Sequence, residues 1–188
     1  MAVGLLPIKH FLMRAFSRYG RIVLRDHYVF VLKDVEKLNF EPVEGGTVVV
    51  YTQAEEIPPA RWDELKSLLG PDYEDSANKL FEDGCRCYVY DVDGKIGSLV
   101  WAVSGRNLKG WWYAIGPEDF VMFSGYTPPA FRGLRLHGKI IAAAYRAESS
   151  AGGKYYCDCN MANLASKKQL QNAGFELISR EKRFKPIR

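Results

Sequence analysis

The sequence lacks long hydrophobic runs, has few cysteines and carries no large excess of either charge. No apolar run approaches the roughly 20 residues that cross a bilayer, so we expect no transmembrane segment. Residues 1–21 hold scattered basic side chains without an apolar core and a small-x-small cleavage site, which argues against a signal peptide. The four cysteines form two Cys-x-Cys pairs, unlike the disulfide framework of a secreted protein. These absences together predict a cytoplasmic protein.

Charge and length limit the partners and the number of domains. A net charge of +4 favours anionic ligands slightly, but the clustered basic residues of a nucleic-acid-binding protein are missing. We therefore expect no nucleic-acid partner. A chain of 188 residues suits one domain with a substantial core and is short for two.

Hydrophobic patterning from residue 46 onward predicts a mixed α/β fold, with a single layer of sheet flanked by helices. Asp93 and Gly94 between two apolar runs are a strong hairpin signal, and Ser76 suits the N-cap of a helix. Gly125 in mid-strand suggests a bulge or the close approach of another group. The predicted order is a strand at 47–52, helices at 58–70 and 76–83, hairpin strands at 85–92 and 95–103, a strand at 120–126, a helix to 148, a strand at 154–159, a helix to 173 and a last strand.

The first 45 residues are predicted to be an N-terminal extension packed on a core domain of residues 46–188. Residues 5–19 place apolar side chains on one face and basic ones on the other, which indicates an amphipathic helix. We expect this helix to pack on the domain; contact with a membrane surface is the alternative. Residues 21–35 are rich in Val, Leu, Tyr and Phe and indicate one or two strands.

The most informative segment is residues 126–138. It reads as a strand that breaks at Pro128 and Pro129, turns through Arg132 and Gly133, and enters a helix at 133–138. The first amides of a helix have no intrahelical partner and lie at the positive end of its dipole. This entrance is therefore predicted to bind a phosphate.

Two spacings in this half resemble the GNAT superfamily of acyl-CoA N-acyltransferases. Pro129 and Arg132 fit its phosphate loop, and Asn163, Ser166 and the pair Gly174-Phe175 fit a second element. The resemblance covers roughly residues 46–185 and implies a GNAT-like fold. It also implies an enzyme that transfers an acyl group, in the first place acetyl from acetyl-CoA, to a primary amine of a small-molecule acceptor.

The resemblance further implies which residues bind the co-substrate acetyl-CoA. The strand would pair with the pantetheine arm, the loop and helix start would hold the pyrophosphate, and two residues of the second element would lie along the arm. These positions are Gly125, Tyr126 and Thr127; Arg132, Gly133, Leu134, Arg135, Leu136, His137 and Gly138; and Asn163 and Ser166. Arg135 and His137 occupy the loop's two glycine positions. We interpret their side chains as pointing away and adding contacts to phosphate; a loop that no longer binds CoA is the alternative.

The catalytic groups are less clearly marked. Leu170 stands where many members of the superfamily carry a tyrosine that acts as general acid, so another group or water must protonate the leaving thiolate. A backbone N–H near Gly125 would polarise the thioester carbonyl. Glu118 and Asp158 are candidate bases, each with a solvated carboxylate as the alternative, and Tyr126 is a candidate proton donor with packing as its alternative.

The cysteine pairs and a run of aromatics are two further candidate sites. Four thiolates could bind zinc only if the strands of Cys85 and Cys157 were adjacent, and at least two strands are expected between them. We therefore predict buried structural cysteines and no metal site. The run Trp111-Trp112-Tyr113 lies beside the expected acceptor entrance, where it could stack on a ligand or pack in the core.

Two alternatives to acetyl transfer stay open. The altered glycine positions and the missing tyrosine favour a catalytically silent GNAT-like module for binding or assembly. The basic residues near the loop would also suit a longer acyl-CoA or the phosphopantetheine of an acyl carrier protein as donor. A homodimer is one assembly compatible with the sequence.

Overall fold

The computed structural model describes residues 22–38, 41, 44–111, 113–148 and 152–186. The amphipathic helix predicted at 5–19 lies outside the described residues. None of the helices in the described ranges is long and apolar enough to cross a bilayer.

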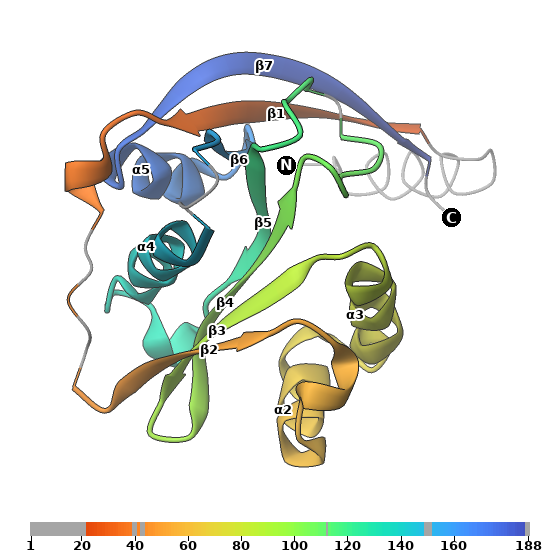
Figure 1. Ribbon diagram of the computed structural model, residues 1–188, viewed down its shortest axis with the longest axis vertical. Coiled ribbons are helices and arrows are strands. Elements are labelled where there is room, and N and C mark those ends of the chain that lie inside the picture. The colour runs from red at the N-terminus through yellow and green to blue at the C-terminus, as the bar shows by residue number, and fades with distance from the viewer. Residues whose placement is uncertain (1–21, 39–40, 42–43, 112, 149–151, 187–188) are drawn as a thin grey trace, which may run out of the picture.

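A mixed sheet of seven strands forms the centre of the described molecule, in the order β2-β3-β4-β5-β6-β1-β7 (Figure 1). All neighbouring strands are antiparallel except β5 and β6, which are parallel. The predicted single layer of mixed sheet is therefore confirmed. The strands are β1 Ile22–Leu32, β2 Gly46–Tyr51, β3 Arg86–Val92, β4 Lys95–Ser104, β5 Phe120–Tyr126, β6 Tyr155–Asn160 and β7 Phe175–Pro186.

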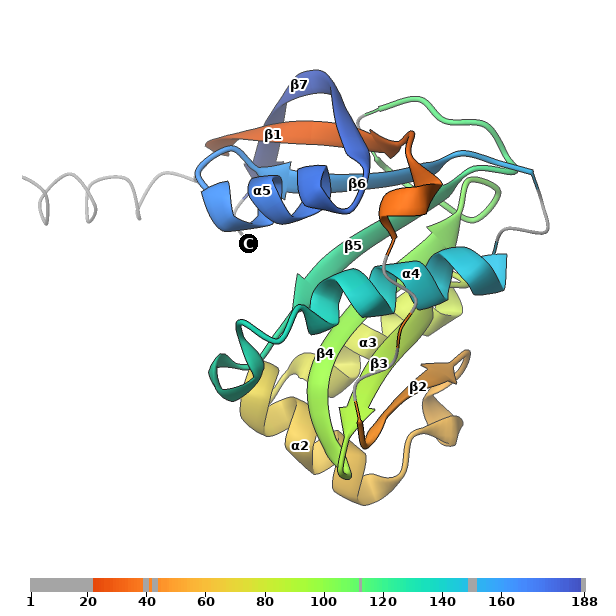
Figure 2. The same cartoon turned by 90° about the vertical axis from the view of Figure 1, so that its left-hand side faces the viewer.

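Two pairs of helices cover the two faces of the sheet. Helices α2 (Pro59–Leu69) and α3 (Tyr73–Glu82) pack on one face, and α4 (Leu136–Glu148) and α5 (Leu164–Asn172) pack on the other (Figures 1 and 2). Alternate residues of each strand enter one of two apolar clusters, as the period of a strand requires. Each face of the sheet therefore has its own core.

Local signals predicted most element boundaries. Asp93 and Gly94 both have positive φ, 50° and 78°, which is the backbone of a tight type I′ hairpin turn. The predicted start of α3 at Ser76 is wrong, because the helix begins at Tyr73. The Tyr73 hydroxyl accepts a hydrogen bond from the Trp101 indole N–H at 3.0 Å, which anchors the first turn on the sheet. The Ser76 hydroxyl donates instead to the backbone carbonyl of Asp72 at 3.1 Å.

Strand β1 lies inside the sheet, between β6 and β7. Val29 and Val31 point into the core beneath α2 and α3, whereas Phe30 points into the core beneath α4 and α5. Both faces of β1 are buried, which explains its dense apolar sequence. The described part of the first 45 residues thus contributes a strand to the same sheet as the later residues; the division at residue 45 stays a prediction.

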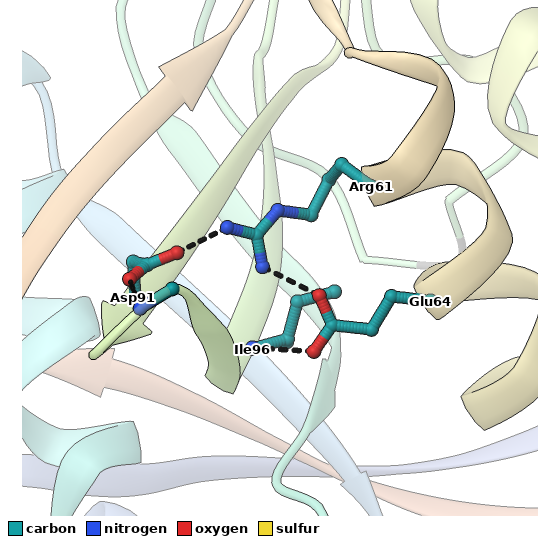
Figure 3. Close-up of polar contacts among 5 residues, drawn as sticks. Arg61, Glu64, Asp91 and Ile96 are labelled. Atoms are coloured by element: carbon teal, nitrogen blue, oxygen red, sulfur yellow. Dashed lines mark hydrogen bonds and ion pairs between the residues drawn. The ribbon is translucent and has the colours of Figure 1, made fainter.

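A polar network fixes α2 against the β3–β4 hairpin (Figure 3). The guanidinium of Arg61 bonds Glu64 at 2.6 Å and also pairs with Asp91, and its side chain is only 13% exposed. Glu64 accepts from the backbone N–H of Ile96 at 2.7 Å, and Asp91 accepts from that of Gly94 at 2.7 Å. Both carboxylates therefore hold the hairpin backbone and the helix together, and this network serves the fold.

Candidate active site

The parallel strands β5 and β6 separate along their length (Figure 2). Their pairing covers three positions, from Phe120 opposite Tyr155 to Met122 opposite Cys157. Beyond these pairs β5 continues to Tyr126 and β6 continues to Asn160. A cavity of about 520 Å³ lies in this opening, lined by both strands and by the beginnings of α4 and α5.

A β-bulge in β5 sits at the mouth of the opening. Trp101 of β4 pairs with Phe123, but Leu99 pairs with Tyr126, so two residues of β5 face one residue of β4. Ser124 takes up the extra length with a φ of 52°. The bulge predicted at the adjacent Gly125 is confirmed. A bulge interrupts the ladder of backbone hydrogen bonds, which makes this stretch of β5 available to a ligand.

The loop from β5 into α4 exposes a row of backbone amides. Within the part of the chain that the structure describes, none of the amides of residues 133–137 donates a backbone hydrogen bond; the first that does is Gly138, to Arg135 at 3.1 Å. The helix begins at Leu136, later than the predicted start at 133. Gly133 and Arg135 have φ of 87° and 58°, which a right-handed helix does not allow. The unpaired amides nevertheless lie where the sequence predicted a phosphate site.

The arginines of this loop are both exposed. Arg132 donates from Nε to the carbonyl of Thr127 at 3.3 Å, which closes the loop on itself. Arg135 forms no ion pair with any described residue. The side chain of Leu136 is 1% exposed and packs in the core, so this residue offers only its backbone to a ligand. The contact of Arg135 with phosphate stays a prediction.

His137 turns inward from the first turn of α4. Its imidazole lies against Gly125, with Cε1 only 2.0 Å from the position that a β-carbon of Gly125 would take. Its Nδ1 lies 3.4 Å from the hydroxyl of the fully buried Ser98. Burial lowers the pKa of His137 to about 4, so the side chain is neutral near neutral pH. It therefore brings no charge to a phosphate, and a contact of His137 with phosphate stays a prediction.

The three predicted catalytic residues lie in different places. Asp158 of β6 lines the cavity. Glu118 is exposed, pairs with Arg106 and does not line the cavity. Tyr126 ends β5; its carbonyl accepts from the Ser98 hydroxyl at 3.1 Å, and its ring packs on the face that α2 and α3 cover. Of these three residues, only Asp158 lines the cavity, as Gly125 does.

A histidine that the sequence did not suggest lies beside Asp158. Nδ1 of His27, from β1, is 2.7 Å from Oδ2 of Asp158, and both side chains are 12% exposed. His27 also lines the cavity. The two residues are 131 positions apart, and only the insertion of β1 next to β6 brings them together. No local pattern around His27 could have indicated this pair.

The second patterned element forms the beginning of α5. Asn163 is the N-cap, and its side-chain oxygen accepts from the backbone N–H of Ser166 at 3.1 Å. This capping bond gives the Asn…Ser spacing a structural reason. Asn163, Ser166 and Leu170 also line the cavity. The Leu170 side chain, which carries no proton donor, is 3% exposed.

Several solved structures of similar architecture are acetyltransferases. A GNAT-family acetyltransferase from Colwellia psychrerythraea superposes with a TM-score of 0.64 at 15% identity, over 92% of this chain and 60% of its own. A tandem GNAT protein from the clavulanic acid biosynthesis pathway gives 0.63 at 16% identity, over 96% of this chain and 58% of its own. The chain has the GNAT fold. An aminoglycoside N-acetyltransferase in complex with CoA gives 0.57 at 20% identity, over 72% of this chain and 91% of its own.

The likeness is one of structure. The sequence matches no protein-family model and no curated protein. The chain spans only 60% and 58% of the first two GNAT proteins, so it corresponds to part of their length.

The cysteines of this GNAT fold lie in, or directly before, two separate strands. Cys85 and Cys87 belong to the β3 side of the sheet and Cys157 and Cys159 to β6, with β4 and β5 between them as predicted. All four are buried and free. Burial raises the pKa of Cys85 to about 11 and that of Cys87 to about 12, so both are thiols at neutral pH. Among the described residues no group of three or more His, Cys, Asp or Glu side chains could hold a metal ion.

Trp111 of the aromatic run lies at the cavity wall, in the cluster beneath α2 and α3. Trp111 lines the cavity and packs edge-on against Tyr156, with ring centroids 6.1 Å apart. Tyr113 packs beside them, 5.9 Å from Tyr156. Trp112 lies outside the described residues. Trp111 therefore both packs in the core and lines the cavity, so the two interpretations of this run are compatible.

Proposed function

We propose that this chain is an acyl-CoA-dependent N-acyltransferase that transfers acetyl from acetyl-CoA to a primary amine of a small molecule, in the cytoplasm. One relationship carries the proposal. The opening between β5 and β6 begins at a β-bulge, and β5 leads directly into a loop whose amides at 133–137 are without backbone partners. The open edge of β5, which suits an amide-containing arm, thus leads straight into a cluster of backbone N–H groups that suits a diphosphate.

The residues at this loop suit an anionic nucleotide. No atom lies within 4 Å of a β-carbon built on Gly133, so the approach to its backbone is open. Arg132 and Arg135 are exposed on the same loop and add positive charge. We infer that the amides of residues 133–137 hold the pyrophosphate and that the bulged part of β5 pairs with the pantetheine arm.

Acyl-CoA supplies an activated thioester carbonyl when it is bound. The chain must hold this carbonyl and direct a deprotonated amine towards it. Backbone N–H groups at the bulge beside Gly125 are suited to polarise the carbonyl, because they are fixed by the strand and need no reorganisation. Asn163 and Ser166 at the start of α5 lie on the cavity wall, where they would flank the arm.

A GNAT-fold module that binds without catalysis is the second candidate. Leu170 offers no proton in the cavity, and the His137 imidazole fills the space beside Gly125. Such a module would bind CoA or acetyl-CoA without turnover. Release of free thiol from acetyl-CoA in the presence of primary amines distinguishes the two, and longer acyl-CoA thioesters and an acylated carrier protein belong in the same assay.

Calorimetric titration with acetyl-CoA tests the binding half of the proposal. We expect a Kd between about 1 μM and 1 mM, the usual range for enzyme substrates. Arg135→Ala and Arg132→Ala should each weaken binding about tenfold, more at low than at high salt. Arg106→Ala is the matched control, because Arg106 is exposed but belongs to another loop and pairs with Glu118. Absence of binding at millimolar acetyl-CoA would overturn the proposal.

A further inference from the structure

We propose that His27 is the general base that deprotonates the acceptor amine, and that Asp158 is its positioning residue; this inference rests on the proposed acyl transfer. The observation behind it is the contact of 2.7 Å between Nδ1 of His27 and Oδ2 of Asp158 at the wall of the cavity. A carboxylate that holds one ring nitrogen of a histidine orients the ring and stabilises its protonated form.

The strand order places this pair on the face of the sheet opposite α4. His27 lies two residues before Val29, which packs beneath α2 and α3, and Asp158 lies two residues after Tyr156, which packs in the same cluster. Since side chains alternate along a strand, both members of the pair face α2 and α3. The phosphate loop leads into α4, which covers the other face. An acceptor entering from the side of α2 and α3 would therefore meet the pair without crossing the acyl-CoA arm.

The charges around the pair favour a cationic acceptor. Asp83 and Lys109 line the same cavity and pair with each other at 2.6 Å, so the charge of Lys109 is matched. On the other side of β1, Glu181 of β7 is the register partner of His27. Among the described residues, Asp158 thus contacts His27, Glu181 lies opposite it on the neighbouring strand, and the charges of Asp83 and Lys109 offset each other. This surplus of carboxylates suits a primary amine that arrives protonated.

The proton and electron balance is simple. The ammonium group of the acceptor gives one proton to Nε2 of His27 while Nδ1 stays bonded to Asp158. The freed lone pair forms a C–N bond with the thioester carbonyl carbon, and the C–S bond breaks with its electron pair going to sulfur. The second proton lost by the nitrogen ends on this thiolate, and His27 releases the first to solvent. The products are the amide, free CoA thiol and one proton.

A purely structural role of the pair His27 and Asp158 can be distinguished from a catalytic one. The strands β1 and β6 are already joined by a ladder of five paired positions, so the bond between His27 and Asp158 is not needed to place β1. If the pair only stabilised the fold, its removal would lower the unfolding temperature without changing the pH dependence of the rate.

The test uses His27→Gln and Asp158→Asn in the full-length chain, with Asp26→Asn as matched control. Asp26 is the neighbour of His27 on the same strand and pairs with Arg180 at 2.8 Å, but it does not line the cavity. Thiol release from acetyl-CoA is measured with n-butylamine, 1,4-diaminobutane and tyramine at saturation, from about pH 6 to about pH 10, because the amines deprotonate at the upper end. Acetyl-CoA binding is measured in parallel by calorimetry.

We expect His27→Gln to lower kcat about 100-fold near neutral pH, with the Kd of acetyl-CoA unchanged within about twofold. The deficit should shrink towards about pH 10, where solvent deprotonates the amine. Asp158→Asn should lower kcat about tenfold or more, because the carboxylate no longer orients the imidazole. Asp26→Asn should match the wild type.

The outcomes separate this inference from the proposed function. Wild-type transfer with an unchanged pH profile in His27→Gln overturns the role of His27 and leaves acyl transfer standing. Acetyl-CoA binding without transfer to any of the three amines overturns both and supports the binding module. Absence of acetyl-CoA binding overturns the proposed function itself.

Discussion

The imidazole of His137 occupies the space next to Gly125 that a strand side chain would otherwise fill, with Cε1 2.0 Å from the ideal β-carbon position. The side chain at this contact thus comes from the helix, and the strand contributes none. This contact joins the beginning of α4 to the bulge in β5, the two elements between which the candidate phosphate loop runs. The position of the loop therefore depends on a helix–strand contact as well as on its own backbone.

Gly125→Ala should disturb this contact strongly. The new methyl group would force the imidazole out of its position, at a cost of about 1–3 kcal/mol in the free energy of unfolding. In a His137→Ala background the same substitution should cost much less, because the clash is gone. Urea unfolding of the two single variants and the double variant measures this coupling. Additive effects would show that the two residues are independent.

His137 should make the fold less stable in mild acid. Its pKa is lowered to about 4 by burial, below the ordinary value of 6.5, so the unfolded chain binds the proton more readily. The stability that depends on a neutral His137 is fully present above pH 6.5 and is lost as the pH falls towards 4. At about pH 5 the loss is at most about 2 kcal/mol. Unfolding free energies at neutral and acid pH should show a smaller pH dependence in His137→Ala than in the wild type; equal slopes would contradict the assignment.

Arg135→Gly should stabilise the protein. Arg135 has a φ of 58°, in the left-handed region that costs a side-chain-bearing residue roughly 1–2 kcal/mol and glycine very little. After the greater chain entropy of glycine is allowed for, we expect a net gain of about 0.5–1 kcal/mol. Arg135→Ala removes the same charge but keeps the strain, so it is the control and should show no such gain. If both variants were equally stabilised, the gain in stability would come from removing the charge and not from relieving backbone strain.

Glu148 should be important for stability at the end of α4. Its carboxylate is 5% exposed and accepts hydrogen bonds from Arg86 and from the Tyr88 hydroxyl of β3. Glu148→Ala leaves the buried hydroxyl without its acceptor and should cost about 2–4 kcal/mol, measured by urea unfolding. Removing Glu118, whose ion pair with Arg106 is exposed, should cost less than about 1 kcal/mol. Similar losses in both variants would show that burial is not the reason.

The sequence alone determined the features that depend on neighbouring residues. Asp93 and Gly94 predicted the hairpin because two positive φ values suit these residue types. The proline break and the helix entrance were visible because turns and helix starts are local in the chain. These local features also located the candidate phosphate site. The beginning of α3 was misplaced because a contact between Tyr73 and Trp101, on another element, extends the helix by three residues.

Only the tertiary structure decided which residues meet in the cavity. β1 lies between β6 and β7, and no local signal states the order of strands in a sheet. That order brings His27 to Asp158 across 131 positions of the chain and turns a histidine of the N-terminal segment into part of the candidate site. The contact of His137 with Gly125 likewise depends on how α4 packs on the sheet. Neighbours in the chain determine the shape of the loop, whereas long-range packing determines which side chains face the opening beside it.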